Sequence, residues 1–182
     1  IQEIVGRRGL DAGSGPSEWR EVQLDGAYQN LKQHFHVVMS TYGSFERISI
    51  ADAATGLVIA ASDDRGLGGS AADQGFWQDA LAAGYWESVK VLRAGPGNLP
   101  RMVVARGIRQ PTLAGGDPDA ISAILIMQVD TDEFLKPLLY LGGGLGGTGE
   151  IVLVDDEARI LMSLNHPLPA GAVAQELVHR LD

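Results

Sequence analysis

The stretch Ile48-Ser-Ile-Ala-Asp52, with the turn Ala-Ala-Thr-Gly56 and the return segment Leu57-Val-Ile-Ala-Ala61, decides the expected fold class. Polar and apolar residues alternate in the first segment, which is typical of a strand with one buried face. A glycine closes the turn and the return segment is wholly apolar, so the stretch predicts a β-hairpin.

A helix is expected on each side of this hairpin. Before it, Ser17 is a candidate N-cap, with Glu18 in the first turn near the positive end of the helix dipole. Apolar residues then recur at steps of four and three up to Gly43, which is expected to end the helix; they are Leu24, Tyr28, Leu31, Phe35, Val38 and Tyr42. After the hairpin, residues 76–83 predict a short helix that Gly84 closes.

Three further strands are expected, at Ser88 to Arg93, Met102 to Ile108 and Ile121 to Val129. The last of these is almost continuously apolar, as expected for a strand at the centre of a sheet. The order of helix, hairpin, helix and three strands predicts an α+β fold, with one antiparallel sheet of about five strands and helices packed on it. Another helix is expected over Thr131 to Leu141.

A second hairpin is expected near the end of the chain. Ile151-Val-Leu-Val-Asp155, a polar turn and Ile160-Leu-Met-Ser163 repeat the pattern of the first hairpin, with an Asp ending one strand and a Ser after the next. Because too few residues follow for a complete sheet, the second copy is expected to be truncated. The patterns divide the chain into an N-terminal helix and linker (1–21), a complete unit (22–141) and the start of a second unit (142–182).

Composition excludes several classes of protein. The 182 residues carry a net charge of −9 and the 14 basic residues are scattered, so neither nucleic acid nor anionic lipid is an expected partner. The absence of cysteine excludes disulfides, zinc–thiolate sites and cysteine nucleophiles. No apolar run approaches the ~20 residues of a membrane span, and the chain opens in a helical pattern, so we expect a piece of a longer protein whose flanking spans are absent here.

No pattern in the chain predicts catalysis, a metal site or a cofactor. Residues 142–147 fit G-x-G-x-x-G, but they follow a helix and precede a strand, which is the reverse of a dinucleotide site. His34 and His36 stand two apart on a helix, so they point to different faces and do not form a chelating pair. The aspartate pairs lie in turns without the ligand spacing of a calcium loop.

The candidate site is a cluster of aromatic residues: Phe76, Trp77, Tyr85 and Trp86. Two interpretations stay open, a helix packed on the sheet or an aromatic-walled pocket. In a pocket between the 76–83 helix and the central strands, Trp77 and Tyr85 would be walls and Asp130 a polar group at a strand end.

An arginine on the adjacent strand is the expected anchor of that pocket. Arg101 and Arg106 are both candidates, but they point to opposite faces of one strand, so only one can face the site, and Arg101 is favoured. A buried guanidinium needs a partner, which favours an anionic ligand such as a small carboxylate.

The order and spacing of these parts resemble the extracellular double Cache sensors, also called PDC or PAS-like periplasmic domains. The resemblance spans nearly the whole chain and rests on Ile48–Asp52 with Thr55–Ile59, Asp73–Leu81, Ile124–Asp130 and Gly146–Asp155. It implies a PAS-like antiparallel five-stranded sheet, a long N-terminal helix, a membrane-distal unit that binds ligand (22–141) and a partial second PAS-like unit.

The chain departs from the members of that family that sense amino acids. Those members carry an Arg followed by Trp-Tyr, then a Tyr and Asp, and an Asp that ends the last strand. Here Gln74 stands at the Arg position, Phe76-Trp77 replaces Trp-Tyr, and only Asp130 matches. Without the arginine there is no bidentate grip on a carboxylate from that position, which argues against an α-amino acid ligand.

The resemblance implies an extracytoplasmic, periplasmic small-molecule sensor domain of a membrane-bound receptor, with a sensor histidine kinase as the first choice. It also implies a homodimer formed through the N-terminal helices. Two alternatives stay open: a small hydrolytic enzyme that uses the aspartates and arginines, and a dimerisation or spacer module without ligand. A pocket enclosed under the 76–83 helix would separate a sensor from a spacer.

Overall fold

The structure is a computed structural model that describes residues 13–82, 88–93, 100–109 and 120–131, and, outside these ranges, positions 1, 5, 6, 9–11, 133, 134 and 137. Of Pro16, residues 88–93, Pro100 and Arg101 it describes the backbone alone. The predicted second hairpin, the glycine-rich segment before it and Tyr85 lie outside the described residues.

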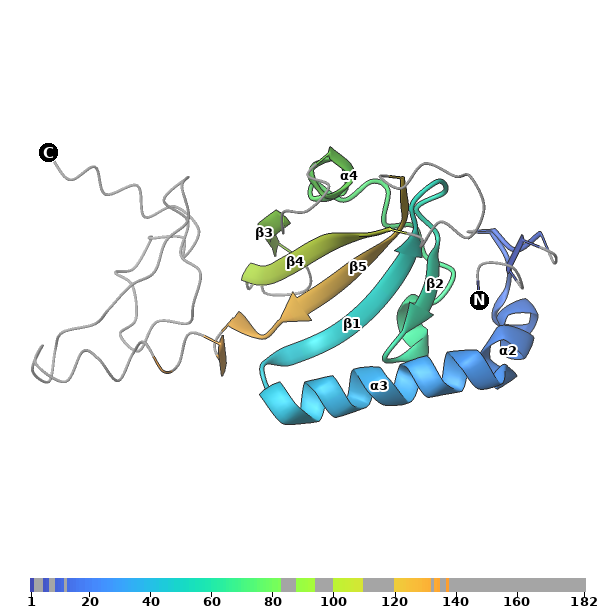
Figure 1. The fold of residues 1–182 in the computed structure, drawn as a ribbon, viewed down its shortest axis with the longest axis horizontal. Helices are drawn as coiled ribbons and strands as arrows, with labels where there is room; N and C mark the ends of the chain where they lie inside the picture. The colour runs from blue at the N-terminus through green and yellow to red at the C-terminus, as the bar shows by residue number, and fades with distance from the viewer. Residues whose placement is uncertain are drawn as a thin grey trace, which may run out of the picture.

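The described strands form one antiparallel, five-stranded sheet in the order β2-β1-β5-β4-β3. Their bounds are β1 Phe45–Asp52, β2 Val58–Ala61, β3 Ser88–Arg93, β4 Pro100–Arg109 and β5 Ile121–Val129. The apolar β5 lies between β1 and β4 at the centre of the sheet, as its composition predicted. The expected α+β class, an antiparallel sheet with helices packed on it, is confirmed (Figure 1).

The turn between β1 and β2 is held by the carboxylate of Asp52. Its Oδ1 accepts hydrogen bonds from the backbone N–H groups of Ala54 and Thr55 and from the Thr55 hydroxyl, at 2.8 to 3.1 Å. Gly56 has a φ of 73°, and a Cβ there would lie 2.5 Å from the Cβ of Ala72. The Asp and the Gly that identified the hairpin in the sequence are therefore the residues that build its turn.

The helical region before the sheet is two helices, α2 (Pro16–Leu24) and α3 (Gly26–Tyr42), rather than the continuous helix that was predicted. Asp25 has extended backbone angles, and its Oδ1 accepts from the N–H groups of Ala27 and Tyr28, so it ends one helix and caps the next. The predicted cap at Ser17 is also wrong. Gly15 is the N-cap, because Pro16 occupies the first helical position and needs no hydrogen-bond acceptor.

The predicted apolar stripe is buried only in its middle. Tyr28 and Phe35 are buried, whereas Leu24 and Tyr42 at the two ends are 72 % and 68 % exposed. The break at Asp25 puts Leu24 out of phase with α3, and Tyr42 instead makes an edge-to-face contact with Phe45. Gly43 ends α3 with a φ of 71°, as predicted.

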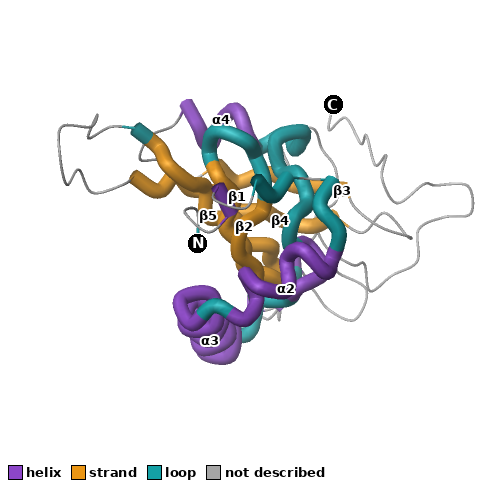
Figure 2. Tube along the Cα trace, turned by 90° about the vertical axis from the view of Figure 1, so that its right-hand side faces the viewer, coloured by secondary structure: helices purple, strands orange, loops and turns teal. Residues whose placement is uncertain are grey.

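Each face of the sheet has its own hydrophobic core. We call the side covered by α2 and α3 the α3 face; its buried residues are Val5, Trp19, Val22, Tyr28, Phe35, Ile48, Leu57, Ile59 and Ala60. The other side, covered by α4 (Trp77–Ala82), is the α4 face; its buried residues are Ala51, Val58, Ala61, Ala71, Phe76, Trp77, Ala80, Val103, Ala105, Ile124 and Ile126. Figures 1 and 2 show α3 and α4 on opposite sides of the strands.

The segment after β2 turns back along the edge of that strand. It contains a short 3-10 helix, η1 (Asp64–Gly66), and then pairs with β2 through Gly68 N–H to Val58 O (2.9 Å) and Val58 N–H to Gly69 O (2.8 Å). This pairing covers an otherwise open strand edge. The segment leads into α4, so it connects the two faces of the sheet.

Candidate ligand-binding face

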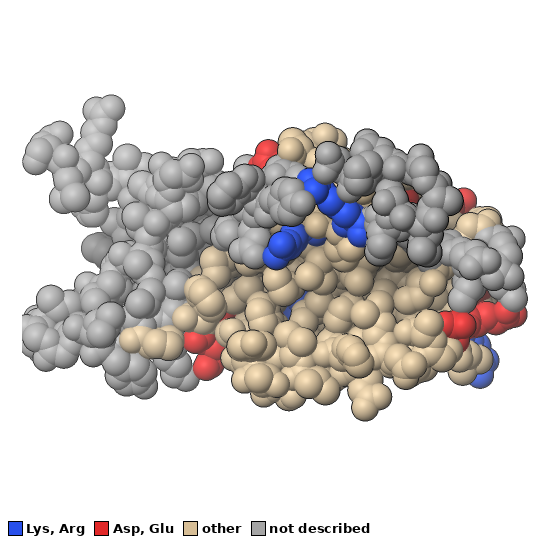
Figure 3. Space-filling model, viewed as in Figure 1, with Lys and Arg blue, Asp and Glu red and all other residues tan. Residues whose placement is uncertain are grey.

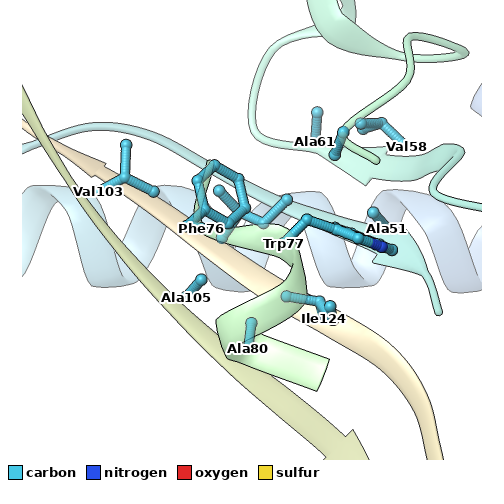
Figure 4. Close-up of a cluster of buried hydrophobic side chains, with 11 residues drawn as sticks. Ala51, Val58, Ala61, Phe76, Trp77, Ala80, Val103, Ala105 and Ile124 are labelled. Atoms are coloured by element: carbon cyan, nitrogen blue, oxygen red, sulfur yellow. The ribbon is translucent and has the colours of Figure 1, made fainter. Parts of the chain in front are cut away.

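Phe76 and Trp77 are core residues of the α4 face. They are 2 % and 3 % exposed, and they lie at the start of α4, where Ala80 N–H donates to the Phe76 carbonyl. The sheet beneath offers small side chains, among them Ala51, Ala61 and Ala105, which leave room for the two rings. Figure 4 shows both rings over the strands, with Val103, Ala51 and Ile124 around them.

The two candidate arginines of β4 are placed differently. Arg106 pairs with Leu125, whose side chain packs against the α3-face core, so Arg106 is exposed on the face opposite Trp77. Arg101 lies in β4 opposite Leu92, and its side chain is outside the described residues. Figure 3 shows basic side chains close to where β4 and β5 lie in Figure 1; the described arginine side chains of β4 are Arg106 and Arg109.

Asp130 follows the last residue of β5 and caps the turn after it. Its N–H donates to the Ser44 carbonyl (2.8 Å), and its Oδ1 accepts from Glu133 N–H (3.1 Å). The register pairs Met102 with Val129, so the next step along both strands brings Arg101 and Asp130 to the same end of the sheet. The backbone thus brings Arg101 and Asp130 together at one end of the sheet. Trp77 packs elsewhere, among Ala51, Ile124 and their neighbours, and Ile124 precedes Asp130 by six residues.

A row of polar residues on the α4 face escaped the sequence analysis. Arg47 of β1 pairs with Gln128 of β5, and Gln128 pairs with Val103 of β4. In the neighbouring row, Ser49 pairs with Ile126, which pairs with Ala105. Because paired residues share a face, Arg47, Ser49 and Gln128 border the apolar floor beneath Phe76. The signal in the sequence was the alternation of Arg47, Ser49 and Ala51.

Arg47 is held by an acidic residue at the start of η1. Its Nη2 lies 3.1 Å from the Asp63 carboxylate, which also accepts from Arg65 Nη2 at 2.8 Å. Burial acts to raise the pKa of Asp63, but the hydrogen bonds from Arg65 and Arg47 outweigh it and hold that pKa below its usual range. Asp63 is therefore charged at neutral pH and shared between two guanidinium groups.

Asp64, the next residue, makes equivalent contacts with side chains of α3. Asp64 Oδ1 accepts from the hydroxyl of the fully buried Tyr28 (2.9 Å), and both carboxylate oxygens accept from Lys32 Nζ (2.9 Å). The hydrogen bond from Lys32 is the main cause that lowers the pKa of Asp64. Burial, followed by the contact with Asp64, raises the pKa of Tyr28 above its usual value. The two adjacent aspartates therefore bind different elements: Asp63 binds Arg47 of β1, and Asp64 binds Tyr28 and Lys32 of α3.

The fold has been seen before in receptor sensor domains. The ligand-binding domain of the amino acid chemoreceptor PctC of Pseudomonas aeruginosa, in complex with GABA, matches with a TM-score of 0.53 and 17 % identity over 90 % of this chain. The sensor domain of the histidine kinase DctB of V. cholerae matches with a TM-score of 0.52 and 12 % identity over 88 %. The resemblance predicted from the sequence is confirmed as a likeness of fold.

This chain spans 66 % of the PctC domain and 64 % of the DctB domain. No protein-family model matches the sequence, and no curated protein matches it either.

Within the part of the chain that the structure describes, no helix is long and apolar enough to cross a membrane. Among the same residues, no three His, Cys, Asp or Glu side chains converge as metal ligands would.

Proposed function

We propose that this chain is the extracytoplasmic small-molecule sensor domain of a membrane-bound signalling receptor, with a sensor histidine kinase as the first choice. The observation that carries the proposal is the fold, which the chain shares with the ligand-binding domain of a chemoreceptor and the sensor domain of a histidine kinase. In this proposal the periplasmic unit 22–141 binds the ligand and unit 142–182 begins a second, smaller module.

The α4 face is the proposed ligand-binding side. Its floor is apolar and made largely of small residues, and it is bordered by Arg47, Ser49 and Gln128. Small-molecule sites are mostly apolar, with a few placed polar groups that fix orientation. On the α3 face, the polar side chains of Tyr28 and Lys32 are both bonded to Asp64.

A spacer module without ligand is the second candidate, and one observation favours it. Phe76 and Trp77 are almost completely buried against the sheet, so their rings already fill the space over Ala51 and Ala105. A ligand would have to bind beside these rings, towards the polar row, or displace one of them.

A screen against small molecules separates the two functions. The chain is heated with carboxylates (acetate, propionate, succinate, 4-aminobutyrate) and uncharged analogues such as propionamide. Ligand at 100 times its dissociation constant stabilises the folded state by ~2.7 kcal/mol and raises the unfolding temperature by several degrees. In NMR spectra, the methyl groups of Val103 and Ile126 shift, and those of Ile48 and Ile59 on the α3 face do not. Binding by no compound, or shifts confined to the α3 face, would contradict the proposal.

We also propose that the receptor is a homodimer through its helical side. Apolar side chains remain exposed on α2 and α3: Leu24, Val37 (57 %) and Tyr42. Association of the isolated chain is expected to be weak, because a membrane anchor would otherwise supply the effective concentration. Sedimentation of a chain with its full N-terminal helix tests this, and a monomer at high concentration would count against it.

A further inference from the structure

The α4 face changes character from one row of the sheet to the next. Ala51 and Ile124 form an apolar row, and Ser49, Ile126 and Ala105 form the row beside it. In the row after that, Arg47 and Gln128 stand next to Val103. An arginine and a glutamine at partly buried positions beside a hydrophobic core are costly unless their polar groups are bonded.

Among the described residues, most of the hydrogen-bonding capacity of these two polar rows is unused. A guanidinium carries five N–H donors, and Arg47 directs Nη2 alone at Asp63. Within the described part of the chain, neither the Gln128 amide nor the Ser49 hydroxyl has a hydrogen-bond partner. The two rows therefore offer donors on three side chains that sit on one face of two paired strands.

The charge of the site is suited to an anion. Asp63 is the acceptor for both Arg47 and Arg65, so two positive charges share one negative charge. Asp64, the next carboxylate, is already bonded to Lys32 and Tyr28. The cluster of Arg47, Asp63 and Arg65 thus carries one uncompensated positive charge.

The guanidinium of Arg47 is also held in place before any ligand binds. Its side chain is 26 % exposed, against 83 % for Arg65, and it is held by Asp63 on one side. The backbone of Gly66 approaches on another side, where a Cβ would lie 3.3 Å from Arg47 Nη1. A group that is already fixed loses little conformational entropy when a ligand binds.

We propose that Arg47, together with Gln128 and Ser49, anchors the carboxylate of a small ligand whose apolar part lies beside the ring of Phe76 or displaces it. This rests on the proposed sensor function and names the ligand class and the anchor of its site. The planar guanidinium matches a carboxylate in bidentate geometry, and the amide and hydroxyl supply the remaining donors. The sequence had directed the search for an anchor to Arg101 and Arg106.

The test measures the affinity of propionate and of propionamide, its uncharged analogue, by calorimetry on the whole chain. Arg47→Met is expected to weaken propionate about tenfold or more, because a hydrogen bond between charged groups is lost. Arg20→Met, which removes the same charge from an exposed position on α2, leaves the affinity within about twofold. Gln128→Leu leaves the contact between Arg47 and Asp63 intact and weakens propionate by about fivefold. Propionamide is expected not to bind measurably.

Each result decides between the inference and the function on which it rests. Propionate binding that survives both Arg47→Met and Gln128→Leu overturns the anchor but leaves the sensor function standing. Tight binding of uncharged molecules, with no carboxylate bound, does the same. Binding by neither class overturns both. Circular dichroism of each variant establishes that it is folded, and Gln128→Leu decides the matter if Arg47→Met does not fold.

Discussion

The two faces of the sheet are packed with side chains of different sizes. On the α3 face, bulky sheet residues such as Ile48 and Ile59 meet bulky helix residues such as Tyr28 and Phe35. On the α4 face, alanines of the sheet meet two large rings at the start of a six-residue helix. A long helix distributes its contacts over many turns, whereas the α4 face depends on Phe76 and Trp77.

The polar groups of the two faces differ in the same way. On the α3 face, Tyr28 and Lys32 both bond to Asp64, while Trp19 Nε1 is buried without a partner in the described part of the chain. On the α4 face, Gln128 and Ser49 have no partner among the described residues. Bonded polar groups at a buried position stabilise the fold, whereas partly exposed polar groups without a partner, such as the Gln128 amide, are available to another molecule; Trp19 Nε1 is instead covered by Gly68. This contrast leads us to assign stability to one face and recognition to the other.

The largest expected effect is that of Trp77→Ala. If the ring is a core residue, its removal leaves a cavity over Ala51 and Ile124 and lowers the free energy of unfolding by about 3–5 kcal/mol. Gln78→Ala, at the next and exposed position of α4, should change it by less than about 0.5 kcal/mol. Urea unfolding measures both. A loss below ~1 kcal/mol for Trp77→Ala would mean that the ring is a displaceable wall, as a pocket would require.

A second substitution tests how firmly the segment after β2 is held to the α3 face. Gly68 has a φ of 79°, and a Cβ there would lie 2.5 Å from Trp19 Nε1. Gly68→Ala is therefore expected to cost about 2–4 kcal/mol, from backbone strain and overpacking together. Gly43 has a similar φ of 71° with open space around it, so Gly43→Ala should cost only about 1–2 kcal/mol. Equal losses would show that Trp19 yields easily.

The strands and the first turn could be predicted from the sequence because their signals are local. Asp52 and Gly56 are read from the sequence and act within a few residues, and β5 has the predicted bounds. The break at Asp25 was missed, since it lies within an apolar repeat that continues across it. Local periodicity does not reveal that a side chain has capped a new helix.

The candidate site was less accessible to sequence analysis because it depends on register. Arg47 was left outside the predicted strand, and Gln128 lies at the end of a nearly continuous apolar run. A β-bulge between Phe45 and Arg47 determines that Arg47, rather than its neighbour, stands opposite Gln128. Pairing between residues about 80 positions apart leaves no local pattern to read.

Tyr28→Phe tests whether the polar contacts of the α3 face contribute to stability. It removes the hydroxyl that donates to Asp64 and leaves the ring and Lys32 in place. The loss is expected to be about 1–2 kcal/mol, because the acceptor is charged but remains bonded to Lys32. Tyr42→Phe is the matched control on an exposed tyrosine, with no measurable change expected. Equal stability of the two variants would contradict the assignment of this face to stability.

The smallest expected effect is a dependence of stability on pH carried by the adjacent aspartates. The pKa values of Asp63 and Asp64 are lowered in the folded chain, so their contribution is present above the unfolded pKa of about 3.9 and is lost as the pH falls through the folded values. Both groups are partly exposed, so each contributes about 1 kcal/mol or less. We expect the unfolding free energy of the wild type to fall between about pH 5 and pH 3, and to fall less in Asp63→Asn and in Asp64→Asn. If Asp63→Asn alone flattens the profile, the contact between Asp63 and Arg47 contributes more to stability than the contact between Asp64 and Lys32. A carboxylate ligand should then restore part of the lost stability by replacing Asp63 at Arg47. A profile that is unchanged in both variants would show that neither contact persists in solution.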